Sequence, residues 1–132
     1  MYRINLLYLI IFILLTSCSR QETVKATSEG QYWKAHMVYE VTESELYNRG
    51  GIEYTGDEEL IHVTYKVITG LGEQGGERYP QENQTAISFG MGATNHPPTK
   101  DEVVTELNHT YIEVQWQTET GEYEERIDLK AN

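Results

Sequence analysis

The side chain whose chemistry is best defined by its surroundings is the thiol of Cys18, the only cysteine in this 132-residue chain. Arg3 precedes an apolar run at residues 6–15, and small polar residues then lead to Cys18. This order is typical of a secretory signal, and the run is too short to span a bilayer comfortably. Because there is no second cysteine, an exported domain of this chain must be held together by its core, without intramolecular disulfides.

Residues Leu15-Thr16-Ser17-Cys18 resemble the lipobox of bacterial lipoproteins. The resemblance implies that residues 1–17 are a removed signal peptide and that the thiol of Cys18 is diacylated. Two acyl chains anchor a protein stably and one does not, because each buried methylene contributes about 0.8 kcal/mol. Two alternatives remain: an ordinary signal peptide with a chance cysteine, and an uncleaved short membrane anchor.

Four histidines, His36, His62, His96 and His109, are the candidate metal ligands. None has the His-Glu-x-x-His spacing that places two zinc ligands on one helical face. His36 and His62 lie on the polar faces of two predicted strands, and with Glu40 they would form a metal site if those strands were neighbours. We favour surface histidines on an acidic protein, and we expect no metal or other cofactor.

Other motifs lack the context that their chemistry needs. Ser88 is not at the strand-to-helix elbow of an activated serine. The glycine-rich segment 70–75 matches a dinucleotide fingerprint, but the turn-like residues after it do not form the required helix. The acidic runs 57–59 and 122–125 lack the alternating oxygen ligands of an EF-hand. The sequence therefore predicts no catalytic residues.

Aromatic residues are the remaining candidates for recognition, because amphipathic rings favour binding surfaces. Inward strand positions predict a core role for Trp33, Trp116, Tyr39, Tyr65 and Tyr123. The tyrosines left to line a surface are Tyr32, Tyr47, Tyr54, Tyr79 and Tyr111.

The net charge of −11 excludes some partners and favours others. An acidic protein repels phosphate backbones and anionic lipid headgroups, so we expect no nucleic-acid partner. A cationic partner or divalent cations would be attracted. Excess acid also simply keeps an exported protein soluble.

Strands are predicted by alternation of apolar and polar residues, which gives one buried face. The alternating segments are 33–41, 61–67, 85–91, 110–117 and 123–129, and segment 51–56 is expected to be a short edge strand. Glycine-bearing turns are expected at 48–51, 70–76 and 120–121. Thr99-Lys-Asp-Glu102 has capping-box spacing and predicts one helical turn.

These elements predict an all-β fold: an antiparallel, Ig-like or fibronectin-III-like sandwich with one short helical turn before the last hairpin. The polar residues 19–30 have one large apolar side chain, Val24, and are expected to be flexible. The expected organisation is a signal peptide at 1–17, a lipidated cysteine and flexible spacer at 18–30, and a β-sandwich domain at 31–132.

The pattern of core residues resembles a known group of proteins. The segments that carry it are Trp33…Tyr39-Glu-Val41, Ile52-Glu-Tyr-Thr-Gly56, Val63-Thr-Tyr65, Ile112-Glu-Val-Gln-Trp116 and Glu125-Arg-Ile-Asp-Leu129. They are similar to the small Ig-like lipoproteins of Bacillus and its relatives, many of which have no assigned activity. The resemblance implies a fold and a compartment, and Cys18 is the only functional residue that it carries over.

Two functions from different classes follow. The favoured one is a non-catalytic module, held by acyl chains on Cys18 at the outer face of the cytoplasmic membrane, that binds a protein, peptide or glycan of the cell envelope. The alternative is an envelope hydrolase or metal-dependent enzyme that uses His36, His62 or His96.

Overall fold

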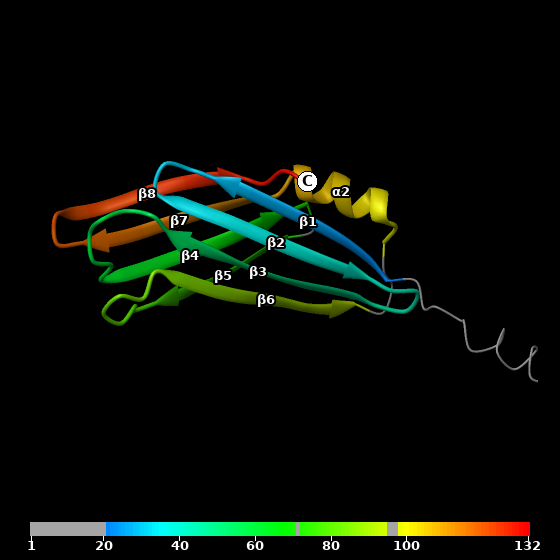
Figure 1. Cartoon of the computed structure of the whole chain (residues 1–132), viewed down its shortest axis with the longest axis horizontal. Coiled ribbons are helices and arrows are strands. Elements are labelled where there is room, and N and C mark those ends of the chain that lie inside the picture. Colours follow the sequence, from blue (N-terminus) through cyan, green and yellow to red (C-terminus); the bar gives the residue numbers. More distant parts are fainter. Residues whose placement is uncertain (1–20, 71, 95–97) are drawn as a thin grey trace, which may run out of the picture.

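Two four-stranded antiparallel sheets lie face to face in the computed structural model, which describes residues 21–70, 72–94 and 98–132 (Figure 1). The strands are β1 (Glu22–Glu29), β2 (Trp33–Val41), β3 (Leu46–Tyr54), β4 (His62–Thr69), β5 (Gly72–Arg78), β6 (Ala86–Thr94), β7 (Tyr111–Thr118) and β8 (Gly121–Asp128). The helix α2 (Lys100–Asn108) lies between β6 and β7. The predicted all-β sandwich is confirmed.

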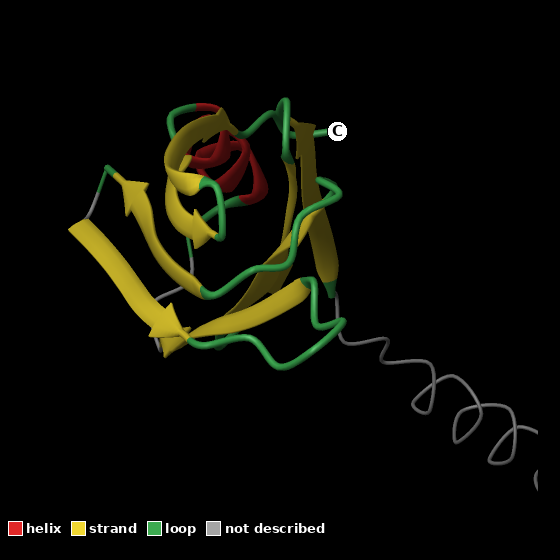
Figure 2. Ribbon diagram, turned by 90° about the vertical axis from the view of Figure 1, so that its left-hand side faces the viewer, coloured by secondary structure: helices red, strands yellow, loops and turns green. Residues whose placement is uncertain are grey.

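The strand order is β1-β2-β3-β6 in one sheet and β5-β4-β7-β8 in the other. The chain changes sheet between β3 and β4, between β5 and β6, and between β6 and β7. Without β1, this is the order of a fibronectin-III-like sandwich, so β1 is an added edge strand. Figure 2 views the two layers from the end that carries the β1–β2, β3–β4, β5–β6 and β7–β8 connections, with α2 at the far end.

The core is formed by inward side chains of both sheets, as alternation predicts. In β2, every second residue from Trp33 to Val41 is buried. In β7, the alternating residues Ile112, Val114 and Trp116 are likewise buried. The complete buried apolar cluster is Val24, Ala26, Trp33, Ala35, Met37, Tyr39, Val41, Ile52, Tyr54, Leu60, Val63, Tyr65, Val67, Ile87, Phe89, Val103, Leu107, Ile112, Val114, Trp116, Ile127 and Leu129.

Three inward assignments made from the alternation are wrong. Ile61 is exposed because it precedes β4, and Thr85 is exposed because it precedes β6. Tyr123 lies on β8, the last strand of its sheet, and remains 39% exposed. Tyr54, expected at the surface, is buried because β3 is a central strand between β2 and β6 and Tyr54 lies opposite the buried Trp33. The side chain of Met91 is outside the described residues.

The flexible spacer predicted at 18–30 is wrong for Glu22–Glu29, which forms strand β1. β1 pairs with the full length of β2, and Val24 and Ala26 are buried against the core. Its other edge meets the C-terminal segment, where Asn132 N donates a hydrogen bond to Lys25 O at 2.9 Å. The ordered domain therefore begins about nine residues earlier than the polar composition suggests.

The glycine-bearing segment 48–51, predicted as a turn, lies inside β3 between β2 and β6. A Cβ on Gly50 would lie 2.6 Å from the backbone oxygen of His36 and 2.8 Å from the Phe89 ring. Glycine is required here because neighbouring atoms approach the backbone too closely for any side chain, which is a known reason for glycine inside a strand. The predicted short edge strand at 51–56 is thus the end of a longer central strand.

The segment 70–76 is also only partly a turn, because Gly72–Arg78 forms the edge strand β5. Nearly all its side chains are exposed, so this strand is held in place by its backbone pairing with β4. Its composition lacks the alternation of apolar and polar residues that predicts a strand. Gly72, Gly75 and Gly76 lie within this strand, and the next element is the strand β6, so the helix that a dinucleotide site needs does not follow them. The turn predicted at 120–121 lies one residue earlier, at 119–120, and the β7–β8 hairpin is confirmed.

The predicted capping box is confirmed: Thr99 Oγ1 accepts a hydrogen bond from Glu102 N at 3.3 Å, and Thr99 N donates to Glu102 Oε2 at 2.8 Å. The helix is longer than one turn, with nine residues. It covers one end of the sandwich with Val103 and Leu107, which are both buried.

Candidate functional site

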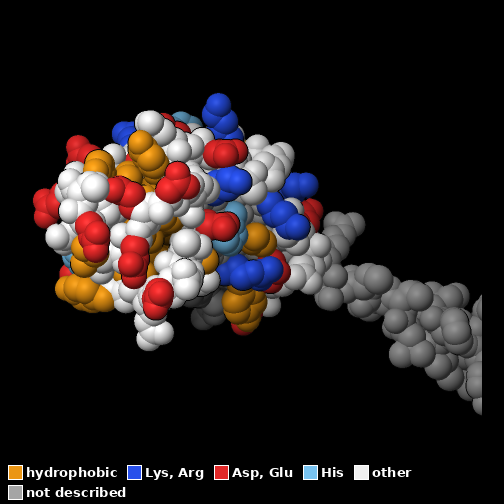
Figure 3. All heavy atoms as spheres, turned by 60° about the vertical axis from the view of Figure 1, so that its left-hand side comes forward, with side chains coloured by type: hydrophobic (Ala, Val, Ile, Leu, Met, Phe, Trp, Pro, Cys, Tyr) orange, Lys and Arg blue, Asp and Glu red, His pale blue; other side chains and the backbone are white. Residues whose placement is uncertain are grey.

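The end of the sandwich opposite α2 is acidic. Its connections between β3 and β4, between β5 and β6, and between β7 and β8 contain carboxylates and no lysine or arginine; the acidic residues are Asp57, Glu58, Glu59, Glu82 and Glu119. Figure 3 shows acidic side chains gathered over this end, while lysines and arginines lie toward the other. We call it the distal end, because β1 begins at the opposite end, where Glu22 pairs with Val41.

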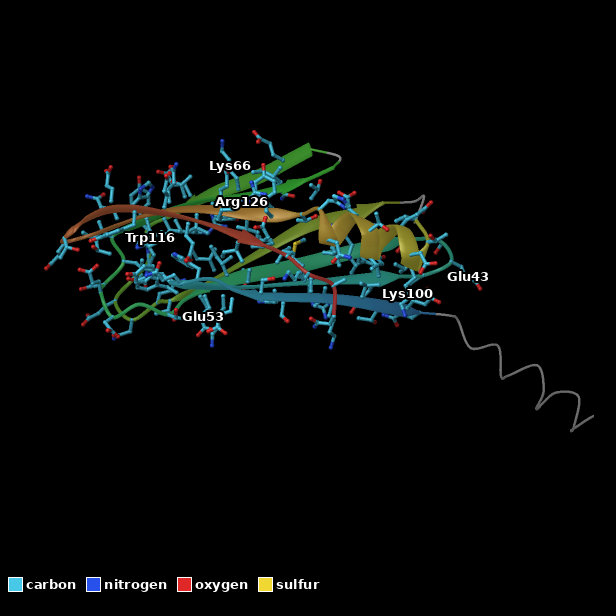
Figure 4. All side chains as sticks on the ribbon, turned by 90° about the horizontal axis from the view of Figure 1, so that it is seen from above. Glu43, Glu53, Lys66, Lys100, Trp116 and Arg126 are labelled. Atoms are coloured by element: carbon cyan, nitrogen blue, oxygen red, sulfur yellow. The ribbon has the colours of Figure 1, made fainter. Side chains whose placement is uncertain are left out.

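Aromatic rings pack together beneath the distal end. The Trp116 ring lies 5.7 Å from that of Trp33, 6.2 Å from Tyr54 and 5.8 Å from Tyr32, and it stacks on Tyr123 at 5.7 Å with planes 25° apart. Trp116 itself is 4% exposed. Figure 4 shows it between the two layers near this end. The buried cluster therefore holds the more exposed rings of Tyr32 and Tyr123 at the surface.

The two pairing partners Trp116 and Tyr123 share a face because they are opposite each other in the β7–β8 register. Aromatic pairs of this kind stabilise a sheet beyond their buried area. Tyr123 OH also lies 2.6 Å from Thr120 Oγ1. The Tyr123 ring is thus fixed on one side by stacking and at its tip by a hydrogen bond, and its other side faces solvent.

Glu58 connects two of the distal loops. Its carboxylate accepts hydrogen bonds from Thr118 Oγ1 at 3.1 Å and Thr120 Oγ1 at 2.6 Å. Burial raises the pKa of the nearby Tyr54 hydroxyl, and the negative charge of Glu58 raises that pKa further. This carboxylate is therefore part of the loop structure and is not a free ligand.

A groove of about 520 Å³ lies on the outer face of β4, β7 and β8 next to the distal end. Its floor consists of polar residues in register: His62 is opposite Gln117, and Thr64 is opposite Gln115. Gln117 and Gln115 are in turn opposite Glu122 and Glu124. We call this the sheet groove; Trp116 and Tyr123 complete its lining.

One rim of the sheet groove is built on His62. Its ring stacks on that of Tyr79 at 4.7 Å with planes 27° apart, and its Nε2 lies 2.5 Å from Glu77 Oε1. The Tyr79 hydroxyl donates to the same carboxylate oxygen at 3.1 Å. This hydrogen bond raises the pKa of Tyr79, and the charge of Glu77 adds to the effect. Tyr79 is 72% exposed and is held in place at the rim.

The polar floor has unused hydrogen-bonding capacity. Five of its residues make no side-chain hydrogen bond or ion pair within residues 21–70, 72–94 and 98–132. They are Thr64, Gln115, Gln117, Glu122 and Glu124. A second hollow of about 320 Å³ shares Gln115 and Glu124 with the groove and extends it toward Arg126. The arrangement is a polar trough along β7 and β8.

A different hollow, of about 510 Å³, lies on the outer face of the other sheet around His36, Ser88 and Ile52. A Cβ on Gly51 would lie 2.8 Å from the His36 ring, so this ring rests on the β3 backbone. Two ion pairs lie on this face: Arg49 Nη1 lies 2.9 Å from Glu40 Oε1, and Lys34 Nζ lies 3.8 Å from Glu29 Oε1. Ser28, His36, Glu53 and Ser88 line the hollow without a side-chain hydrogen bond or ion pair among the described residues.

The metal site considered from the sequence is not formed. His36 is on β2 and His62 is on β4, in different sheets, and Glu40 is paired with Arg49. Among the described residues, no three His, Cys, Asp or Glu side chains come together to hold a metal ion. Ser88 lies in the hollow beside His36, with no base bonded to its hydroxyl in the described part of the chain.

Two candidate residues, Cys18 and His96, lie outside the described residues. His109 Nδ1 lies 2.7 Å from the carbonyl oxygen of Thr105 at the end of α2. Of the five tyrosines assigned to the surface, Tyr32, Tyr47 and Tyr79 are exposed. Sequence reasoning missed the sheet groove, although its polar residues at 62, 64, 115, 117 and 124 are outward positions of three predicted strands and Glu122 directly precedes the last of them.

Comparisons with known proteins identify no relative: no family model, curated protein or solved structure matches the chain. Among the described residues, no helix is both long and apolar enough to cross a bilayer.

Proposed function

We propose that this chain is a lipoprotein of the bacterial cell envelope: a non-catalytic binding module held at the outer face of the cytoplasmic membrane by acyl chains on Cys18. The lipobox-like sequence Leu15-Thr16-Ser17-Cys18 supports the anchor. The sheet groove is its recognition surface, because it combines free polar side chains with the fixed, exposed ring of Tyr79 beside His62 at its rim.

The observation that carries the proposal is the arrangement of the two ends. Three residues separate Cys18 from β1, and even a fully extended chain spans about 3.5 Å per residue. The end of the sandwich where β1 begins is therefore held near the membrane. The sheet groove lies at the distal end, where it faces away from the bilayer toward the rest of the envelope.

Detergent partitioning tests the anchor. Wild-type protein from bacterial membranes is expected in the detergent phase of a Triton X-114 separation. Mass spectrometry is expected to detect the acyl groups on Cys18. The Cys18→Ser variant is expected in the aqueous phase. Unchanged partitioning of this variant would refute the anchor.

Fluorescence quenching tests the orientation. Glu43, in the β2–β3 turn, and Glu119, in the β7–β8 turn, are both exposed and lie at opposite ends (Figure 4 labels Glu43). Because acylation occupies the only native thiol, Glu43→Cys and Glu119→Cys each provide a single site for a dye. In vesicles with nitroxide-labelled headgroups, we expect stronger quenching at position 43; equal quenching contradicts the orientation.

A further inference from the structure

The sheet groove carries chemistry that points to one class of ligand. We propose that it binds an uncharged oligosaccharide, laid along β7 and β8 across the outer face of the sheet. The inference rests on the proposed function and assigns the ligand class of the same surface.

The floor of the groove matches the hydrogen-bonding pattern of sugar hydroxyls. Each hydroxyl both donates and accepts, and the Gln115 and Gln117 amides do the same, while the Glu122 and Glu124 carboxylates only accept. These four side chains and the Thr64 hydroxyl have no partner in the described part of the chain, so binding breaks no intramolecular contact.

One rim supplies a ring for the apolar C–H face of a pyranose unit. Tyr79 is exposed beside His62, and it is fixed before any ligand arrives by stacking on His62 and by its hydrogen bond to Glu77. Tyrosines offer a large amphipathic surface at low entropic cost. The fixed position of Tyr79 reduces the ordering cost of binding, which is the usual benefit of preorganisation.

The shape of the groove favours a chain over a single sugar. The 520 Å³ groove continues into the 320 Å³ hollow through the shared residues Gln115 and Glu124. Both volumes lie within or near the range of small-ligand sites, about 300–1,000 Å³ each. A linear ligand of several units fills the length of this trough.

Other polymers fit less well. β4 and β7 are paired on both sides, so strand addition by an extended peptide is limited to the outer edge of β8 and does not use the floor of the groove. The floor also lacks the apolar pockets that anchor protein partners. Glu77, Glu122 and Glu124 lie at or beside the groove, and Arg126 in the adjoining hollow is paired with Asp128, so nucleic acids and anionic sugars are repelled.

Calorimetry on the full, acylated protein tests the proposal. The protein is held in micelles of a detergent without a sugar headgroup, because maltosides would compete. The probes are cellohexaose and the hexamer of N-acetylglucosamine as neutral chains, hexagalacturonate as an anionic chain, and hexalysine as a cationic peptide. We expect one neutral hexamer to bind, with hexagalacturonate and hexalysine at least tenfold weaker.

Matched variants locate the site. Tyr79→Ala and Gln115→Ala are expected to weaken binding of the neutral hexamer at least tenfold. Tyr47→Ala removes another exposed tyrosine, from the outer face of the other sheet, and is expected to leave the affinity unchanged. Both tyrosines and Gln115 point outward, and circular dichroism confirms that each variant is folded.

Three results would overturn the proposal: no binding of either neutral hexamer at millimolar concentration, binding that does not respond to Tyr79 and Gln115, or tighter binding of hexalysine. Hexalysine binding that is lost in Gln115→Ala would refute the sugar ligand and leave the groove as a recognition surface. Failure of the anchor is read separately, from the partitioning of Cys18→Ser.

Discussion

The carboxylate of Glu125, on β8, accepts a hydrogen bond at 2.5 Å from the backbone N–H of Gln31, which lies 94 positions earlier in the β1–β2 turn. The N–H of Tyr32 donates to the same carboxylate at 3.1 Å. One side chain thus connects the edges of the two sheets near the distal end. It also fixes the turn that positions the exposed ring of Tyr32 against Trp116.

Replacing Glu125 with alanine is expected to lower the free energy of unfolding by about 1–2 kcal/mol, because hydrogen bonds to a charged group are lost. Gly30→Ala is expected to cost a similar amount, since its Cβ would lie 2.8 Å from the Glu125 carboxyl carbon and displace it. Urea unfolding followed by tryptophan fluorescence measures both changes.

The double variant of Gly30→Ala and Glu125→Ala tests whether Gly30→Ala acts by displacing the Glu125 carboxylate or by a general effect on the turn. With Glu125 already removed, Gly30→Ala should cost little, so the two changes are non-additive. Additive costs would show that the carboxylate contact is not what makes glycine necessary. Glu124→Ala, one position away and without a side-chain partner among the described residues, is the control and should change stability by less than about 0.5 kcal/mol.

Strands with many apolar residues on one face were predictable from the sequence, and those held by partners distant in the chain were not. β2 and β7 alternate over their whole length, which is sufficient to identify them. β1 has only Val24 and Ala26 inward, and its stability comes from pairing with β2 and with the C-terminal segment. β5 has no apolar side chain at all and depends on backbone pairing with β4.

The candidate site shows the same division. Alternation correctly assigned His62, Thr64, Gln115 and Gln117 to an outer face, but register alone decides that they meet in one groove. Tyr54 and Tyr123 exchanged their expected roles because the place of each strand in its sheet sets their exposure: β3 is a central strand and β8 is an edge strand. Which strands are neighbours is a long-range property that a single sequence does not contain.

The role of β1 is testable with two neighbouring residues. Val24→Ala is expected to lower the free energy of unfolding by about 1–3 kcal/mol, because Val24 is buried in the core. Lys25→Ala, which alters the outward face of the same strand, should have an effect below about 0.5 kcal/mol. Chemical denaturation measures both. Equal midpoints for the two variants would mean that residues 22–29 are not part of the folded domain.

Stability is expected to fall above pH 10. Burial raises the pKa of Tyr39 and of Tyr54 above the ordinary value of 10.0, so the folded state resists ionisation of both hydroxyls. The unfolded chain then loses protons first, and stability that is complete below pH 10 is lost as the pH rises toward the folded pKa values. Urea midpoints between pH 8 and pH 11.5 measure this decline.

Two variants assign the decline to its source. Tyr54→Phe should flatten the dependence above pH 10, even though it starts from a different stability at pH 8. Tyr123→Phe, at an exposed ring of the same cluster that is not among the causes of the Tyr54 shift, should keep the wild-type slope. An unchanged slope in both Tyr54→Phe and Tyr39→Phe would show that buried tyrosines do not cause the alkaline loss.

The charge of Glu58 is expected to set part of the pKa of Tyr54. Glu58→Gln removes the negative charge that raises this pKa but keeps an oxygen to accept from Thr118 and Thr120. The Tyr54 pKa should therefore move down toward 10, and its share of the alkaline stability loss should shrink. Carbon-13 NMR of the labelled tyrosine ring follows this titration directly. Glu59→Gln changes the adjacent exposed carboxylate, which is not among the causes of the Tyr54 shift, and should leave the Tyr54 pKa unchanged. An equal decrease of this pKa in both variants would mean that overall charge, rather than Glu58 itself, sets the pKa of Tyr54.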